Sequence, residues 1–160
     1  MKNKLQKGMT FLELLVAMFV LIVGISGVAA MLSNTMSASN SNVSRLQAAY
    51  LAGEGVEIVR NIRDNNILNY NGWHNGISPG SWEVVYDSMT LSGVDPANPN
   101  FLKIDNNGFY NYDVGSDSTF KRVVDINING DVLEITSRVS WQEKGVDQEL
   151  EVISHLYNWR

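Results

Sequence analysis

The chain has 160 residues, 44% of them hydrophobic, and a formal net charge of −5. This length accommodates one domain with an appendage, and the apolar content is sufficient for a packed core. The acidic balance argues against a nucleic-acid-binding surface, and the absence of cysteine excludes disulfides, thiolate zinc sites and a cysteine nucleophile.

The N-terminus combines a basic segment with a long apolar one. The first seven residues contain three lysines and no acid, and positions 14–32 carry no charge. About 20 apolar residues are enough for a helix to cross a bilayer. Lysines beside such a span stay on the cytoplasmic side, so we expect the rest of the chain to lie outside. Glu13 stands at the opening of the span, where a carboxylate costs free energy, up to about 2.5–3.5 kcal/mol at the bilayer centre.

Two general interpretations of this N-terminus leave Glu13 unexplained. A secretory signal peptide would be cleaved near the small residues Val28, Ala29 and Ala30, but its apolar core is normally about 7–15 residues long and unbroken. A plain signal anchor would hold an enzyme or binding domain outside the membrane. It accounts for the span and its orientation, but gives no reason for the carboxylate.

The segment KGMTFLE at positions 7–13 resembles the processing site of type IV prepilins and type II secretion pseudopilins. In that family a short basic leader ends in glycine, and a near-apolar helix follows with glutamate at its fifth position. The resemblance implies cleavage between Gly8 and Met9 and methylation of the new amine on Met9. Two features depart from the family pattern: Met9 replaces the usual phenylalanine, as in the minor pseudopilin branch, and the first proline is Pro79, so the proline that often kinks the helix is missing.

The resemblance also gives Glu13 a role in subunit assembly. After cleavage, Glu13 of one subunit would meet the terminal amine of a neighbour in a bundle of helices. Two unit charges about 4 Å apart attract by roughly 4 kcal/mol at an effective dielectric constant of about 20, which is comparable to the insertion cost. The simpler alternative is that Glu13 only ends the span and is compensated by the helix dipole, by about 0.3–1 kcal/mol.

The partners and location follow from the same resemblance. It implies prepilin peptidase, other pilin or pseudopilin subunits and, indirectly, an assembly platform and ATPase. The chain would cross the inner (cytoplasmic) membrane once and then enter a pilus or pseudopilus. We expect no enzymatic activity and no cofactor, because the sequence contains no phosphate-binding glycine loop, metalloprotease motif or triad-like arrangement.

The next segment is helical in part. Positions 33–44 are rich in serine and asparagine, which weaken a helix and by themselves favour a linker, whereas the resemblance favours continuation of the helix. Positions 43–65 show helical periodicity, and Asp64, Asn65 and Asn66 would end the helix. The apolar face predicted to cover the core consists of Leu46, Tyr50, Val56, Val59 and Ile62.

The remainder predicts an antiparallel sheet. Positions 69–119 are rich in turn residues, with short strands at 82–86, 101–104 and 109–112. Positions 120–128, 132–141 and 146–157 alternate like half-buried strands joined by the turns NGD and EKG. The predicted fold class is therefore α+β, with a pilin-like long N-terminal helix packed on an antiparallel sheet.

This interpretation divides the chain into four parts. They are a leader at 1–8, a transmembrane or filament-core helix at 9–32, a helical extension at 33–68 and a head domain at 69–160 with variable loops at 69–119.

Few side chains outside the N-terminus indicate a site. Asp105, Asn106, Asp113 and Asp117 provide oxygen atoms near glycines, as a calcium loop does. Their spacing does not fit an EF-hand, and such clusters more often form plain turns, so we predict no metal site. His74 in a loop and His155 on the polar face of the last strand are interpreted as surface residues.

Overall fold

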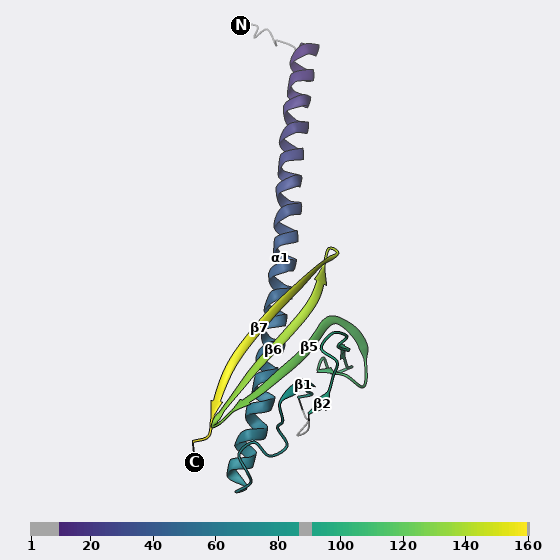
Figure 1. Ribbon diagram of the computed structural model, residues 1–160. Helices are drawn as coiled ribbons and strands as arrows, with labels where there is room; N and C mark the ends of the chain where they lie inside the picture. The colour runs from purple at the N-terminus through teal and green to yellow at the C-terminus, as the bar shows by residue number, and fades with distance from the viewer. Residues whose placement is uncertain (1–9, 87–90, 160) are drawn as a thin grey trace, which may run out of the picture. The chain divides into compact units, whose positions relative to one another are not determined.

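The computed structural model describes residues 10–86 and 91–159 (Figure 1). Helix α1 (Phe11–Leu68) comes first, and the described strands follow it. The chain separates into two compact units, Met1–Asn42 and Val43–Arg160. Each unit is described by itself below.

In the first unit, α1 includes the serine- and asparagine-rich stretch, so residues 33–42 are helical rather than a linker. The hydroxyl of Thr35 donates a 2.9 Å hydrogen bond to the carbonyl of Met31 one turn earlier. This bond satisfies the hydroxyl within the helix and limits its competition for other backbone groups.

In the second unit, α1 continues beyond the predicted stop at 64–66 and ends at Leu68. Tyr70 adopts a left-handed conformation with φ of 57°. Its N–H donates to the carbonyl of Ile67, and the N–H of Asn71 donates to the carbonyl of Asn66. This pair of bonds is a Schellman motif, which satisfies carbonyls that the helix end leaves open.

The predicted apolar face of this helical segment is correct for Val56, Val59 and Ile62, which are buried, and wrong for Leu46 and Tyr50. Leu46 is 56% exposed and Tyr50 is 71% exposed. The sheet instead covers a face that contains small residues, which let the two backbones approach closely. The buried residues of α1 are Ala48, Leu51, Ala52, Gly55, Val56, Ile58, Val59, Ile62, Arg63 and Ile67.

Ion pairs lie along the outer part of this segment. Arg60 pairs with Glu57 at 2.8 Å, one helical turn away. Oδ1 of Asp64 lies 2.6 Å from Nε of Arg63, and Glu54 reaches across to Arg122 of the sheet.

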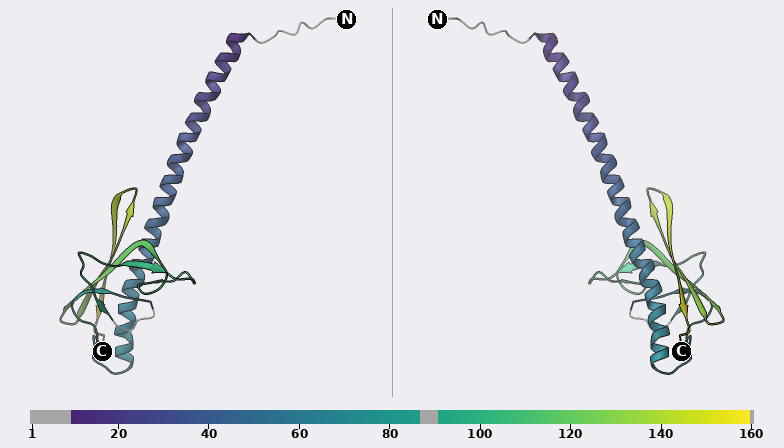
Figure 2. Two further views of the ribbon diagram at one scale, coloured as in Figure 1. Left: turned by 90° about the vertical axis from the view of Figure 1, so that its right-hand side faces the viewer. Right: turned by 90° about the vertical axis from the view of Figure 1, so that its left-hand side faces the viewer.

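The strands form one antiparallel sheet, which lies along one face of the C-terminal part of α1 (Figure 2). The predicted three-stranded meander is present, but further strands extend it because β5 also pairs with β1 and β3 along its other edge. The strands are β1 (Gly80–Glu83), β2 (Ser92–Gly93), β3 (Phe101–Ile104), β4 (Tyr110–Asn111), β5 (Ser116–Asn129), β6 (Val132–Glu143) and β7 (Val146–Tyr157). Strands β3 and β7 have the predicted bounds. Strand β1 lies earlier than predicted, and β5 and β6 are longer than predicted.

The two long hairpins have the turns that their sequences predict. Between β5 and β6, Gly130 takes a φ of 60° at the first position of a two-residue loop, the place that type II′ turns give to glycine. Between β6 and β7, Lys144 and Gly145 have φ values of 52° and 79°, which is the type I′ pattern.

The core lies between α1 and the inner face of the sheet. Alternate residues of β5 and β6 point into it, as predicted, and Leu156 of β7 joins them, while Leu150 and Val152 are only partly buried. The resulting architecture is α+β, a helix packed on an antiparallel sheet. The core side chains from β5 and β6 are Phe120, Val124, Ile126, Leu133, Ile135, Val139 and Trp141.

Gly55 marks the closest approach of the helix to the sheet. A Cβ added at this position would collide with the hydroxyl of Ser137, lie 3.0 Å from a methyl group of Val124 and lie 3.3 Å from Cδ of Arg122. A glycine in mid-helix normally weakens the helix by roughly 1 kcal/mol relative to alanine. Here it permits contacts that a side chain would prevent.

Arg122 is the largest fully buried side chain in the described part of the chain. Its Nη1 group donates to the carbonyl of Leu51 and to Oε2 of Glu54, both at 2.9 Å, and its Nη2 group donates to the carbonyl of Val84 at 2.5 Å. The guanidinium thereby joins β5 to the helix and to the segment after β1. A buried charge needs this kind of pairing, because its desolvation is otherwise costly.

We predict opposite effects of alanine at two neighbouring helical glycines. Gly55→Ala should lower the free energy of unfolding by about 1–3 kcal/mol, because its Cβ overpacks the contact with the sheet. Gly53→Ala, which has open space around the new methyl group, should raise it by about 0.5–1 kcal/mol through helix propensity. Urea unfolding of the full chain in detergent, followed by tryptophan fluorescence, measures both. Equal effects of the two substitutions would contradict the close contact at Gly55.

A second prediction concerns pH. The hydroxyl of Tyr112 donates to the carbonyl of Arg122 at 3.0 Å, and burial raises the pKa of Tyr112 to about 12. A pKa that is higher in the folded state adds stability below about pH 10, and this contribution is lost between about pH 10 and 12, in total about 2–3 kcal/mol. Tyr112→Phe should therefore be less stable than the unmodified chain by about 1 kcal/mol at pH 8 and more stable near pH 12.

The pH dependence is read from the difference between the two proteins, since other tyrosines and lysines titrate equally in both. A constant difference from pH 8 to pH 12 would show that Tyr112 ionises without penalty.

Candidate functional site

Glu13 lies in the first turn of α1. The other two predicted site residues, Gly8 and Met9, lie outside the described residues. The residue before the helix, Thr10, accepts a hydrogen bond from the backbone N–H of Glu13 at its side-chain Oγ1, at 3.3 Å. Thr10 is thus the N-cap of the helix. The sequence interpretation missed it, although the spacing T-x-x-E at positions 10–13 is the sequence signal of a capping box.

The carboxylate of Glu13 is open. Within the part of the chain that the structure describes, no hydrogen bond or ion pair reaches it. Its position near the positive end of the helix dipole is favourable by about 0.3–1 kcal/mol. This is less than the insertion cost of a carboxylate near a bilayer centre, so the helix dipole alone does not compensate for Glu13 if it enters lipid.

The helical segment after Glu13 exposes its apolar residues on all sides. Phe11, Phe19 and Ile25 are each more than two-thirds exposed, and no residue of the most apolar window is buried. This window has a mean hydropathy of 2.6, so the helix is long and apolar enough to cross a membrane. The hydroxyl of Ser26 donates to the carbonyl of Ile22 at 2.7 Å, which leaves no unsatisfied donor on that side chain.

The acidic loop of the head unit is built from turns. Oδ1 of Asp105 accepts hydrogen bonds from the N–H groups of Asn107 and Phe109 at 2.8 and 2.9 Å. Asp113 and Asp117 are exposed. No three His, Cys, Asp or Glu side chains converge as metal ligands among residues 10–86 and 91–159. Asp105 therefore acts as an acceptor for its own loop, which is the turn role considered for it above.

The two histidines lie on the surface of the head unit. His74 stacks edge-on against Trp73 in a loop, with ring centroids 5.3 Å apart. His155 is on the exposed face of β7, where its Nε2 lies 3.2 Å from Oε2 of Glu134, the residue opposite it on β6. Each has an ordinary structural partner.

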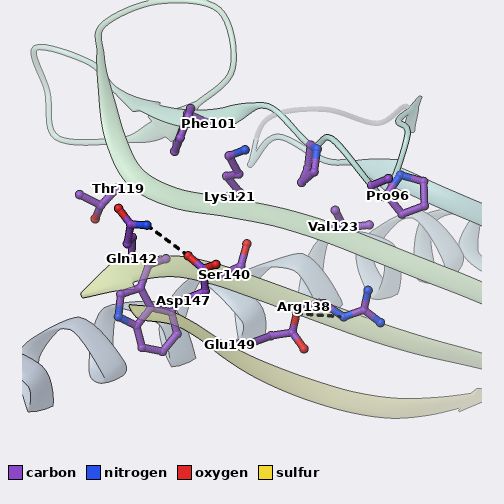
Figure 3. A pocket seen from close by; sticks show the side chains of 13 residues that line it. Pro96, Phe101, Thr119, Lys121, Val123, Arg138, Ser140, Gln142, Asp147 and Glu149 are labelled. Atoms are coloured by element: carbon purple, nitrogen blue, oxygen red, sulfur yellow. Dashed lines mark hydrogen bonds and ion pairs between the residues drawn. The ribbon is translucent and has the colours of Figure 1, made fainter. Parts of the chain in front are cut away.

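An open groove of about 470 Å³ lies on the outer face of the sheet, between β5–β7 and the segment that leads into β3 (Figure 3). Arg138 in its floor contacts Glu151 at 2.8 Å, Asp125 at 3.4 Å and Glu149 at 3.7 Å. The hydrogen bond with Glu151 raises the pKa of Arg138 above its ordinary value. Arg138 is thus the centre of a surface network of carboxylates, of which Glu149 lines the groove.

The remaining cation of the groove is Lys121. Its Nζ lies 4.4 Å from the centre of the Phe101 ring, which is a cation–π contact. The described residues that line the groove include no pair of a nucleophile and a general base.

Comparison with known proteins adds one finding. Residues 3–29 match the prokaryotic N-terminal methylation motif. No curated protein and no solved structure matches the chain.

The matched segment contains most of the basic leader, Gly8, Glu13 and most of the apolar run. The match marks the N-terminus as similar to that of type IV prepilins and pseudopilins, and it supports cleavage and N-terminal methylation of a prepilin-type substrate. The motif implies processing by prepilin peptidase and assembly with other pilin subunits, and together with the apolar helix it indicates membrane anchoring.

We predict that calcium does not alter the stability of the head unit. The oxygen of Asp105 already accepts two backbone hydrogen bonds, so added calcium or a chelator should leave the urea midpoint unchanged. Asp105→Ala should lower the free energy of unfolding by about 1–2 kcal/mol, because two N–H groups lose their acceptor. Asp113→Ala, at an exposed carboxylate, is the control and should change it by less than about 0.5 kcal/mol. A midpoint that rises with calcium would show that the loop binds the ion.

Proposed function

We propose that the chain is a structural subunit of a filament of the type IV pilus or type II secretion pseudopilus kind. Prepilin peptidase cuts after Gly8, the amine of Met9 is methylated, and the subunit assembles through its N-terminal helix. The observation that carries this proposal is the methylation-motif match at residues 3–29, combined with an apolar helix that carries an open carboxylate in its first turn.

The orientation follows from charge. Lys2, Lys4 and Lys7 precede the apolar span and stay on the cytoplasmic side of the inner membrane, so the head unit lies outside. An assembly platform and its ATPase then act on the subunit from the membrane and the cytoplasm. The head unit contributes the outer surface of the filament, and no catalytic step is assigned to it.

Glu13 is the proposed assembly residue. Its carboxylate pairs with the terminal amine of a neighbouring subunit, which only the cleaved chain provides at this place. The attraction of roughly 4 kcal/mol at about 4 Å is comparable to the cost of placing the carboxylate in lipid. A lone anchor has no such partner, so the same residue is unfavourable in a monomer and favourable in an assembly.

A second surface supports assembly through the helix. Val43, Leu46 and Tyr50 lie at intervals of three and four residues and are each more than half exposed, so they form one apolar line on the helix of the head unit. The sheet covers a different face of this segment. A neighbouring helix that packs on this line removes its apolar surface from water, at about 25 cal/mol per Å².

The test begins with the mature N-terminus. Mass spectrometry of the protein from its native host should find Met9 as the first residue, with a methylated amine. Gly8→Leu should abolish this cleavage, because the peptidase must approach the backbone closely. An intact Met1, or cleavage near Ala30, would instead support a plain anchor or a signal peptide.

Assembly is tested separately. Glu13→Ala should be cleaved like the unmodified chain but should enter sheared filaments at a level at least about tenfold lower, the factor that corresponds to losing about 1.4 kcal/mol of the pairing energy. Glu57→Ala removes an exposed helical carboxylate that pairs with Arg60 on the same helix, and it should be incorporated normally. Normal incorporation of Glu13→Ala would exclude the proposed role of this residue.

A further inference from the structure

Strand β7 forms one edge of the sheet. Its twelve residues pair with β6 without interruption from Val146 to Tyr157, and no described strand pairs with its other side, the open edge. The backbone N–H and C=O groups along such an edge can bind a further strand. Short length, a bulge, proline or lysine commonly limits this pairing, and β7 has none of these features.

The hairpin between β6 and β7 determines which residues present backbone groups to the open edge. In a two-residue hairpin the residues that flank the loop form a hydrogen-bonded pair, so Val146 directs its N–H and C=O groups towards Glu143 of β6. Every second residue from Val146 on does the same, in agreement with the hydrogen bond from the N–H of Asn158 to the carbonyl of Asp131. The residues between them direct these groups to the open edge. They are Asp147, Glu149, Glu151, Ile153, His155 and Tyr157.

The side chains of these six residues all lie on the exposed outer face of the sheet. The first three are acidic, whereas Ile153, His155 and Tyr157 carry no negative charge at neutral pH. On the inner face, Leu150 and Val152 are only partly buried against the core. A strand added to the open edge would cover these two side chains further.

Charge restricts how two β7 strands can pair antiparallel, because like charges directly opposite each other destabilise a sheet. A pair centred on Val152 uses the whole edge and places no carboxylate opposite another. A centre at Glu151 places that carboxylate opposite itself, and a centre at Ile153 leaves Asp147 beyond the end of the other strand. Arg138 of β6 contacts two of the acids and offsets part of their charge. The opposed residues in the pair centred on Val152 are Glu151 and Ile153, Glu149 and His155, and Asp147 and Tyr157.

We propose that the open edge of β7 binds the β7 edge of a second copy of this chain, in the antiparallel register centred on Val152. Such a pair is a closed two-fold interface to which both copies contribute the same surface. The two-fold axis points the two head units in opposite directions along the strands, whereas the subunits of one filament point the same way. The contact therefore joins subunits of two separate filaments. This placement rests on the proposed function, but the pairing itself does not.

Cysteine cross-linking tests the register, since the chain has no cysteine of its own. In the proposed pair the two copies of Val152 are directly opposite and not hydrogen-bonded, so their Cα atoms lie about 4.5 Å apart, within disulfide range. With copper phenanthroline as oxidant, Val152→Cys should give disulfide-linked dimers of the full chain in detergent. Leu150→Cys and Ser154→Cys are matched controls on the same face. Each would lie roughly 13 Å along the strand from its own copy, so neither should be linked.

The linked product decides between possible occupants of the edge. A dimer of the chain that forms at least about tenfold faster with Val152→Cys than with either control supports the proposal. Equal linking of the three variants, or no linking of Val152→Cys, would overturn the register. A product of Val152→Cys with a different protein in isolated filaments, identified by mass spectrometry, would assign the edge to another partner.

Ile153 offers a test without a disulfide. It is 58% exposed and in the proposed pair lies opposite Glu151 of the second copy. Ile153→Lys should lower the concentration at which the full chain dimerises in detergent by roughly fivefold, and Ile153→Glu should raise it by a similar factor, since each dimer contains two such cross-strand pairs. Analytical ultracentrifugation measures both. Equal shifts for lysine and glutamate would contradict a carboxylate at the opposed position.

These outcomes differ from a failure of the proposed function, because dimerisation in detergent requires neither cleavage after Gly8 nor a filament. If the chain enters no filament but Val152→Cys is linked, the proposed function is wrong and the edge contact stands. If filaments form and Val152→Cys is linked neither in detergent nor in filaments, only the edge contact is wrong.

Discussion

The close contact between α1 and the sheet at Gly55 determines the geometry of the head unit. Because Gly55 has no side chain, Ser137 and Val124 approach the helix backbone. At the same level, the guanidinium of Arg122 reaches the carbonyl of Leu51 and the carboxylate of Glu54. The apolar contact excludes water, and this strengthens the charged hydrogen bonds that cross it. One buried network therefore holds together the helix, β5 and the segment after β1.

The N-terminal unit differs from the head unit, because its apolar side chains are exposed and no contact within the described residues reaches its single carboxylate. In water this surface would be strongly unfavourable, and lipid removes that cost for every residue except Glu13. The N-cap at Thr10 satisfies the backbone N–H of Glu13. In the proposed function, a second molecule with a positive charge at the start of its helix balances the remaining cost, and the proposed cleavage after Gly8 creates such a charge.

The sequence predicted the parts of the fold that follow local rules. The hairpin turns with Gly130 and Gly145, and the alternation along β5–β7, depend on neighbouring residues alone. The helical face was only partly predictable, because the sheet selects it by close approach at Gly55 rather than by the bulk of Leu46 and Tyr50. The pairing of β5 with β1 and β3, and the burial of Arg122, require knowledge of segments far apart in the chain. At the N-terminus Glu13 was found through the family resemblance, whereas Thr10 was overlooked although its signal is local.

The helix of the head unit has an exposed apolar line, which consists of Val43, Leu46 and Tyr50. Their spacing is that of a helix face that packs on something, yet the sheet packs on a different face because Ala48, Ala52 and Gly55 allow a closer contact. Three large apolar side chains on the uncovered face of the helix contribute little to the stability of the single chain. In the proposed assembly, burial of that line against another helix adds a favourable free energy to that of the Glu13 pairing. One face of the helix thus packs on the sheet, and the proposed function assigns the exposed face with Val43, Leu46 and Tyr50 to association.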